Sequence, residues 1–315
     1  MSGVPTSGDE RTVLERLATL LGPPPAGEVW AGDDAAVVEN PPGHLLFSTD
    51  ALVEGVHFTR ALSSLEDIGW KALACNLSDL AAMGGRPLAA VVALCGAAAA
   101  DLDGIYRGVT GAAERYGCAV VGGDLSDAEE MVVTVAVLGT TDGRPPVLRS
   151  GGRPGDRLFV TGPLGSSAAG LRLLRAGEGE SNEAVRRHRR PLPRLGEGTA
   201  AAELGASAML DLSDGLSLDL DRLARASGVG VELITVPVAA GASEEEALGG
   251  GEDYELLFSL PPGREAAGLF AARGLATPIE IGVLVGDRDR RTLRGAPLPL
   301  LGYLHRLSGG RPEGE

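Results

Sequence analysis

The chain has 315 residues, of which 44% are hydrophobic, and it carries a formal net charge of −15. This length predicts about two domains at roughly 150 residues each, and the composition is typical of a globular protein. The excess of negative charge argues against nucleic acid or an anionic membrane surface as a partner. No unbroken apolar run of about 18 residues predicts a membrane span, and residues 1–10 lack the basic and apolar segments of a secretory signal.

The first half of the chain predicts alternating helices and strands. An amphipathic helix fits residues 10–21, and a longer helix fits 66–83, ended by two glycines. The other elements expected in this half are strands at 45–49, 88–94, 120–121 and 131–138 and a helix at 103–116. A turn-rich segment at 141–146 marks the predicted domain boundary, between residues 1–144 and residues 145–315.

The second half repeats the mixture of helices and strands. Strands are predicted at 157–161, 208–212, 231–234, 255–260 and 278–284, and helices at 166–174 and 216–226, with a helix start at 243–246. Residues 177–190 predict a mobile polar connection, and residues 308–315 a disordered tail. Because both halves mix α and β, the fold class is α/β (α+β), and the alternation also allows a doubly wound sheet.

Three cysteines, Cys75, Cys95 and Cys118, lie among small apolar residues. This setting predicts core side chains rather than disulfides or metal ligands. Unpaired buried cysteines are typical of a reducing compartment, so a cytoplasmic protein is expected.

Seven aspartates stand beside apolar runs or glycines, where an ionised carboxylate is costly unless it is paired or hydrogen-bonded. They are Asp33, Asp34, Asp50, Asp79, Asp124, Asp211 and Asp214. Any one of them could be a helix cap or turn former, but their number favours a shared cation site over independent capping. Carboxylate oxygens suit Mg²⁺, so the pattern predicts magnesium-dependent phosphate chemistry.

The neighbours of these aspartates support a metal site. Residues 48–50 read Ser-Thr-Asp and residues 211–214 read Asp-Leu-Ser-Asp, so an extended chain would turn alternate oxygen donors toward one cation. Asp79 follows Asn76 by three residues, on one side of a predicted helix. Glycine at 123, before Asp124, would let the backbone approach a phosphate closely.

Other phosphate-binding motifs are missing from the sequence, including the P-loop and the kinase His-Arg-Asp loop. Residues 162–165 follow a strand and open a helix, which suits either an anion site at the helix N-terminus or a tight turn. Among four histidines only His57 is a candidate, with a surface-loop residue as the alternative. Residues 250–256 combine three acids with a tyrosine, which suits substrate contact or a plain turn.

Taken in order, these segments resemble the thiamine-monophosphate kinase family. That family shares a superfamily with aminoimidazole ribonucleotide synthetase, selenophosphate synthetase and a hydrogenase-maturation protein. The resemblance runs from about residue 31 to residue 303 and is carried by residues 32–36, 48–58, 76–84, 122–124, 149–156, 211–216 and 250–256. Leu125 stands where the family usually has threonine, and Gly152 replaces a common alanine.

The resemblance implies a two-domain fold of the aminoimidazole ribonucleotide synthetase type. Residues 1–144 would bind ATP and magnesium and form a homodimer through their sheet, and residues 145–315 would form a C-terminal α/β domain. Carried over by position, the magnesium ligands would be Asp34, Ser48, Thr49, Asp50, Asp79, Asp124, Asp211 and Asp214, with Asp124 and Asp214 catalytic. ATP would contact Tyr106, Gly123, Arg149 and Ser213. Thiamine monophosphate would contact His57, Glu252 and Tyr303, although Tyr303 also suits a role in the core.

The implied reaction is direct in-line phosphoryl transfer from ATP to thiamine monophosphate, giving thiamine diphosphate. A phosphate acceptor with a second pKa of about 6 is already anionic at neutral pH, so no general base is needed. Metal ions would screen the repulsion between the two anions. Two alternatives stay open: another ATP-dependent synthetase of the superfamily that forms a phosphorylated intermediate, or a non-catalytic nucleotide- or magnesium-binding protein.

Overall fold

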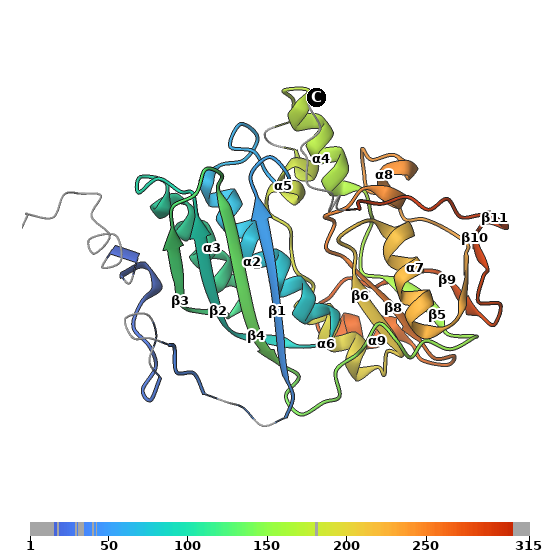
Figure 1. Ribbon diagram of the computed structural model, residues 1–315. Coiled ribbons are helices and arrows are strands. Elements are labelled where there is room, and N and C mark those ends of the chain that lie inside the picture. The colour runs from blue at the N-terminus through green and yellow to red at the C-terminus, as the bar shows by residue number, and fades with distance from the viewer. Residues whose placement is uncertain are drawn as a thin grey trace, which may run out of the picture.

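The computed structural model describes residues 16–17, 19–28, 30, 35–39, 41, 43–179 and 182–304, and contains two β-sheets (Figure 1). The N-terminal sheet has the strand order β1-β4-β2-β3. Its strands are β1 (Leu45–Val53), β2 (Arg86–Cys95), β3 (Ala119–Ser126) and β4 (Val132–Thr140). Strand β4 runs antiparallel to β1 and β2, whereas β2 and β3 are parallel.

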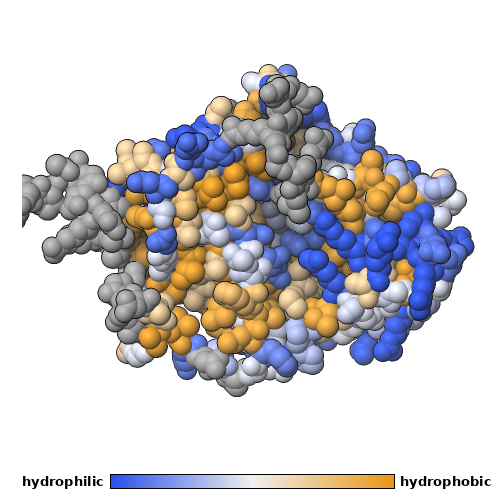
Figure 2. Space-filling model, in the orientation of Figure 1, coloured by the Kyte–Doolittle hydropathy of each residue, from blue (hydrophilic) through white to orange (hydrophobic). Residues whose placement is uncertain are grey.

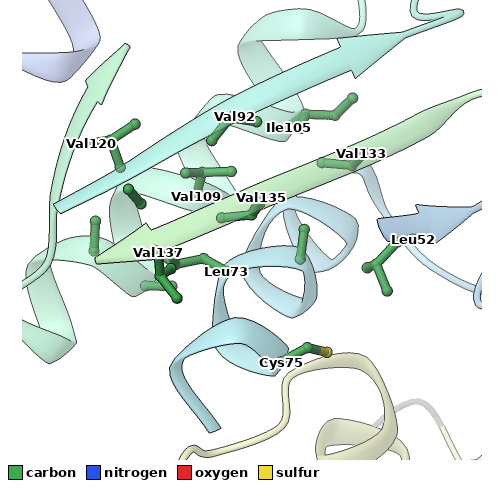
Figure 3. Packing of buried hydrophobic residues seen from close by; sticks show 14 of the residues in the cluster. Leu52, Leu73, Cys75, Val92, Ile105, Val109, Val120, Val133, Val135 and Val137 are labelled. Carbon is green, nitrogen blue, oxygen red and sulfur yellow. The ribbon is translucent and has the colours of Figure 1, made fainter. Parts of the chain in front are cut away.

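Two helices, α2 (Leu65–Ala82) and α3 (Leu102–Tyr116), cover one face of this sheet (Figure 1). Helix α2 begins with a capping box, because Ser64 accepts from the Asp67 N–H while the Asp67 side chain accepts from the Ser64 N–H. Helix α3 ends at Gly117, whose φ of 66° suits a residue without a Cβ. Valines of the strands pack against both helices and form the core of this half (Figure 3).

The other face of the N-terminal sheet is bare of helices. Successive side chains of a strand point to opposite faces, so in β1 Leu46 and Leu52 are buried against the helices while Phe47 is 76% exposed. Leu45 and Val91 are also exposed large hydrophobic residues of this face. Figure 2 shows hydrophobic residues gathered over it. This half of the molecule therefore presents an apolar surface that its own helices do not cover.

The C-terminal sheet has seven strands in the order β11-β10-β7-β9-β5-β8-β6. They are β5 (Arg157–Val160), β6 (Ala208–Asp211), β7 (Gly230–Leu233), β8 (Leu256–Leu260), β9 (Ile279–Val285), β10 (Arg291–Leu293) and β11 (Ala296–Pro297). Only β7 and β10 are paired in parallel. A doubly wound sheet is therefore wrong. Alternation of helices and strands does not specify which strands pair. Strand β5 pairs with β8 and β9, which both lie far from it in the sequence.

Six helices are described in this half: α4 (Ser166–Arg175), α5 (Glu183–Arg189), α6 (Leu195–Glu203), α7 (Leu216–Ser227), α8 (Glu244–Gly249) and α9 (Ala266–Ala272). Helix α5 replaces part of the mobile connection predicted at 177–190. Asn182 caps it by accepting from the Ala184 N–H, and Ala184, Val185 and His188 bury one side of it. These three residues stand within a polar run and give no clear helical pattern in the sequence. The mobile connection predicted at 177–190 was therefore wrong for the residues of α5.

Helix α2 contacts both halves of the molecule. It packs against β1 and β4 of the first sheet, while Ala81 and Ala82 at its end lie in a cluster with Phe258 of the second. The boundary predicted after residue 144 falls in the connection between β4 and β5. Of the helix predicted at 10–21, residues 16–17 and 19–21 are helical, and the rest lies outside the described residues, as does the tail at 308–315. None of the described helices is both long enough and apolar enough to span a bilayer.

Candidate functional site

Two aspartates from different halves of the chain lie where helix α2 meets the second sheet. Ser48 of β1 donates its hydroxyl to Asp79 of α2, with Oγ 2.5 Å from Oδ2. Ser78, beside it on the helix, donates to Asp211 at the end of β6, with Oγ 2.7 Å from Oδ2. Two serine–aspartate pairs thus bring β1, α2 and β6 to one place.

Ionisation of this pair is unfavourable in the folded protein. Burial, together with the nearby Asp79 carboxylate, raises the pKa of Asp211 to about 7. Burial also raises the pKa of Asp79, and the Ser48 hydroxyl bond and the Arg149 guanidinium offset only part of this rise. Because burial and the neighbouring carboxylate both disfavour ionisation here, a cation between the two groups would relieve the cost.

The donor set of this pair fits magnesium. Within the described part of the chain, no group of three or more His, Cys, Asp and Glu side chains is arranged to hold a metal ion by itself. Mg²⁺, however, is usually bound through one or two carboxylates, with substrate phosphates and water completing its octahedron. Asp79 and Asp211, with the serine hydroxyls beside them, are a donor set of that kind.

Strand alternation divides the predicted ligands of the first sheet. Ser48 and Asp50 lie on the helix side of β1, where the Asp50 N–H donates to the Asn76 side chain of α2, at 2.9 Å. Thr49 points to the bare face, and its hydroxyl donates to the carbonyl oxygen of Val135, at 2.9 Å. The Thr49 side chain is therefore directed away from the acidic pair.

Asp124 also lies apart from the acidic pair. It is in β3, separated from β1 by two strands, which corresponds to about 14 Å at roughly 4.8 Å per strand. Its carboxylate accepts from the Ser126 hydroxyl at 2.9 Å, and it shares a row with Ala51 on the bare face. Gly123 is required by packing, since a Cβ there would lie 1.9 Å from the Val92 carbonyl oxygen. Asp33 and Asp34 are outside the described residues.

Asp214 belongs to a third group, at the start of α7. Its carboxylate pairs with Arg222, at 2.5 Å. Asp219 accepts from the N–H groups of Asp214 and Gly215, and so caps the helix from within its first turn. Burial raises the pKa of Asp219 to about 6 in spite of the hydrogen bond from the Asp214 N–H. The arrangement holds the Asp214 loop in place, immediately after Asp211.

Two other segments flank this loop through backbone hydrogen bonds. The Glu252 N–H donates to the Ser213 carbonyl at 2.8 Å, and the Tyr303 N–H donates to the Asp214 carbonyl at 3.0 Å. Glu252 and Tyr254 both have positive φ, at 65° and 52°. Such backbone strain in residues other than glycine is typical of functional loops, where the surroundings hold it in place.

Glu252 lies in a cluster of charged and polar groups from both halves. Its Oε1 is 2.7 Å from Lys71 Nζ, and its Oε2 is 3.5 Å from His188 Nδ1. Burial alone would raise the pKa of Glu252, but Lys71 and His188 bring it below its usual value. Lys71 also donates to the His57 carbonyl, at 3.3 Å. The structure thus brings the predicted substrate residues His57 and Glu252 together around Lys71.

Sequence reasoning missed Lys71 and His188. The available signal for the first was composition, since Lys71 is the single lysine among 28 basic residues. The imidazole of His188 is buried on α5, which lowers its pKa to about 4. It lay in a segment predicted to be a connection, and nothing in its spacing pointed to the site.

The helix N-terminus predicted as an anion site is occupied by the protein itself. Asp253 accepts from the N–H groups of Gly165 and Ser167 at the start of α4, at 2.6 and 3.0 Å. Burial raises the pKa of Asp253 to about 7 in spite of these bonds. The start of α4 therefore anchors the Glu252 loop by binding Asp253, the residue after Glu252.

The remaining predicted contacts of ATP lie in different settings. Arg149 is close enough to Asp79 and Asp211 to offset part of the rise in the pKa of both. Ser213 lies in the loop beside Asp214. Tyr106 is buried in the core between α3 and its neighbours, and burial raises its pKa to about 12. The structure brings Arg149 and Ser213 to the site and places Tyr106 in the core.

Comparison with known proteins shows which family the chain belongs to. Residues 32–141 match the AIR synthase related protein N-terminal domain, and residues 153–293 match its C-terminal domain. The thiamine-monophosphate kinase of Mycobacterium tuberculosis is 41% identical over 264 residues, 79% of each chain. That of Bacillus subtilis is 40% identical over 248 residues, 73% of this chain and 76% of its own.

Solved structures give the same result. The structure of AaThiL complexed with AMPPCP and TMP has 36% sequence identity and a TM-score of 0.75, and covers 83% of this chain and 87% of its own. The hydrogenase maturation protein HypE of E. coli has a TM-score of 0.75 at 20% identity over 96% of this chain and 98% of its own, which shows a shared fold. On these similarities, the chain belongs to the thiamine-monophosphate kinase family of AIR synthase related proteins.

Proposed function

We propose that this protein transfers the γ-phosphoryl group of ATP directly to thiamine monophosphate, giving thiamine diphosphate and ADP. The observation that carries the proposal is the pairing of the partly buried Asp79 with the buried Asp211, which the bond from Ser78 of α2 to Asp211 brings together across the two halves. A structure in the same family is complexed with AMPPCP and TMP, an ATP analogue and, by the family's name, thiamine monophosphate.

Magnesium would be held by Asp79 and Asp211, with Ser48 and Asp50 beside them. When bound, it would neutralise phosphate charge and so reduce the repulsion between donor and acceptor. Arg149, which already acts on both carboxylates, supplies a fixed positive charge for the ATP phosphates. Asp214 and Asp124 would serve further metal positions, the first beside Asp211 and the second on the bare sheet face.

Thiamine monophosphate would lie near Glu252. The thiazolium ring is positive, and Glu252 stays ionised because Lys71 lowers its pKa. Tyr303, 48% exposed and tied by its backbone to the Asp214 loop, would stack its ring on the cationic ligand. His57 would also position the substrate, since its carbonyl shares Lys71 with Glu252 and so lies close to it.

A single incubation tests the proposal. Purified protein, ATP, Mg²⁺ and thiamine monophosphate should give thiamine diphosphate and ADP in equal amounts, with no free phosphate. A synthetase of the same superfamily would release ADP and phosphate only with another acceptor. A non-catalytic binding protein would retain ATP unchanged, and either result would overturn the proposal.

The pH dependence should be shallow, because the acceptor needs no general base. From about pH 7 to 9 kcat should stay nearly flat, since the phosphate is already ionised above its second pKa of about 6. His57 accepts the Val53 N–H at Nδ1, 3.0 Å away, so its ring is committed to positioning. The His57→Ala variant should therefore raise KM for thiamine monophosphate more than it lowers kcat. A normal KM with kcat reduced about a thousandfold would show that His57 takes part in the chemistry.

The bare sheet face is proposed to pack against a second copy of the chain. Phe47, Leu45 and Val91 form an exposed apolar surface there, and large surfaces of this kind mark interfaces. A second copy on this face would also enclose Asp124, which lies on it. The Phe47→Glu variant should therefore convert a dimer to a monomer at micromolar concentration, as measured by sedimentation, while Val56→Glu, exposed in a loop beyond β1, should not. A Phe47→Glu protein that stays dimeric would contradict this interface.

A reducing compartment such as the cytoplasm is the proposed location. Cys75 and Cys118 are buried, Cys95 is partly buried, and all three are free thiols. Burial raises the pKa of Cys75 far above its usual range and that of Cys118 to about 12, so neither is a reactive thiolate. Free core cysteines of this kind are usual where thiols stay reduced.

A further inference from the structure

Lys71 is the centre of a contact between the two halves that the proposed reaction does not use directly. Its ammonium is buried, with the residue 3% exposed. It lies 2.7 Å from a Glu252 carboxylate oxygen and 3.3 Å from the His57 carbonyl oxygen. His57 belongs to the segment after β1, Lys71 to α2 and Glu252 to the loop before β8. One side chain therefore links three segments that are far apart in the sequence.

We propose that Lys71 is a positioning residue that sets the distance and orientation of His57 and Glu252, and so determines affinity for a cationic phosphate ester without touching ATP. This inference rests on the proposed function, because both residues are its predicted substrate contacts. Lys71 acts through Glu252 and is itself covered by protein.

The structure gives two reasons why Glu252 needs such a partner. Its backbone is held at a positive φ of 65°, which is strained for a residue with a Cβ. Its side chain is three-quarters buried, where an ionised carboxylate without a partner would be costly. Lys71 pairs with one carboxylate oxygen, and the buried His188 ring lies 3.5 Å from the other. Ser167, at 2.9 Å from His188 Nδ1, holds that ring in turn.

Lysine suits this position better than arginine does. The ammonium is compact and can direct three donors to separate acceptors, whereas a guanidinium is planar and larger. The rest of the chain uses arginine for its ion pairs, with one lysine among 28 basic residues. Arg190, for example, pairs with Asp67, which lies one turn before Lys71 on the same helix.

The test uses the full-length protein and two substitutions at residue 71. Lys71→Met keeps the length of the side chain but removes its charge and its hydrogen-bond donors. Lys71→Gln keeps a donor without the charge, and it serves as the test if the methionine variant does not fold. Each should raise KM for thiamine monophosphate about 10- to 100-fold, with KM for ATP within twofold and kcat within about fivefold. A thermal shift on adding thiamine monophosphate should be lost in parallel, while the shift on adding ATP is kept.

Arg190→Met is the matched control. It removes a cross-domain ion pair one turn away on the same helix, and the interactions described for its partner Asp67 are the helix cap and this ion pair. It should lower the melting temperature and leave both KM values unchanged. If both residue-71 variants lose affinity for ATP and thiamine monophosphate equally, or keep both, the inference is overturned. A wild-type protein that forms no thiamine diphosphate would instead overturn the proposed function, and the inference with it.

Discussion

The Asp79→Asn and Asp211→Asn variants should each lose about a thousandfold in kcat at saturating magnesium. This corresponds to about 4 kcal/mol at 1.36 kcal/mol per tenfold. Each substitution removes a charged oxygen from the place where the serine-linked pair would hold Mg²⁺. The double variant should lose little more than either single variant, because ligands of one ion act as a unit. Steady-state formation of thiamine diphosphate measures all three.

The same Asp211→Asn variant should be more stable than the wild type without magnesium. The pKa of Asp211 is raised to about 7 in the folded protein, above its value of about 3.9 in an unfolded chain. Between these values the unfolded state binds fewer protons, so the wild type loses stability as the pH rises, and the loss is complete above about pH 7. The neutral amide of the variant carries no such cost, so the stability difference should grow from pH 4 to 7 in EDTA and shrink when Mg²⁺ is added.

Asp142 provides the control for both measurements. It is an exposed aspartate whose side chain pairs with Arg86 at the surface, away from the acidic pair. Asp142→Asn should keep full activity and show no gain in stability that depends on magnesium. An Asp79→Asn protein with wild-type turnover would mean that this residue serves only to bind Ser48, and the proposed metal position would have to be abandoned.

Replacing Arg194 by methionine is expected to lower the free energy of unfolding by about 3 kcal/mol. Arg194 forms two hydrogen bonds to Glu255, one of them 2.8 Å from Nε to Oε2, and the Glu255 side chain is only 7% exposed. Removing one partner of a buried pair leaves the other charge unpaired, which typically costs about 3–5 kcal/mol. Thr161, at 2.5 Å from Glu255, offsets part of the loss. Urea unfolding would measure the change.

A double variant, Arg194→Met with Glu255→Gln, separates charge from packing. It removes the buried Glu255 charge and leaves only Glu197, a more distant partner of Arg194 at 3.6 Å, without the arginine, so it should recover most of the lost stability, and Thr161 can still bond to the amide. If the double variant is as unstable as Arg194→Met alone, the loss would come from the packing of the arginine stem. Arg172→Met, which breaks an exposed pair with Glu246, should change stability by less than about 1 kcal/mol.

The fold of the N-terminal half was largely predictable from local pattern. Strands β1, β2 and β4 and helices α2 and α3 begin and end within a few residues of their predicted bounds. Each is a long segment with many apolar residues, which makes it easy to recognise in the sequence. The two-domain fold followed from the order of the motifs. Helices α6 and α9 were not predicted, since they are short and rich in alanine and glycine, with no clear periodic face.

The choice of residues near the site was also carried by sequence, since Asp79, Asp211, His57 and Glu252 were all candidates. Which of them meet was decided by the tertiary structure. A strand sends neighbouring side chains to opposite faces, so Thr49 and Asp124 lie on the bare face while Ser48 is bonded to Asp79.

Sequence alone, then, singled out Asp79 and Asp211 as carboxylates in apolar surroundings, where an isolated charge is costly, but it also predicted one shared site for aspartates that the structure places in separate groups. Tertiary packing decided the partners: Asp253 fills the helix N-terminus that looked free, and Lys71 joins His57 to Glu252. Such contacts join residues about 14 to 180 positions apart, and no local pattern of charge or periodicity encodes which distant segments meet.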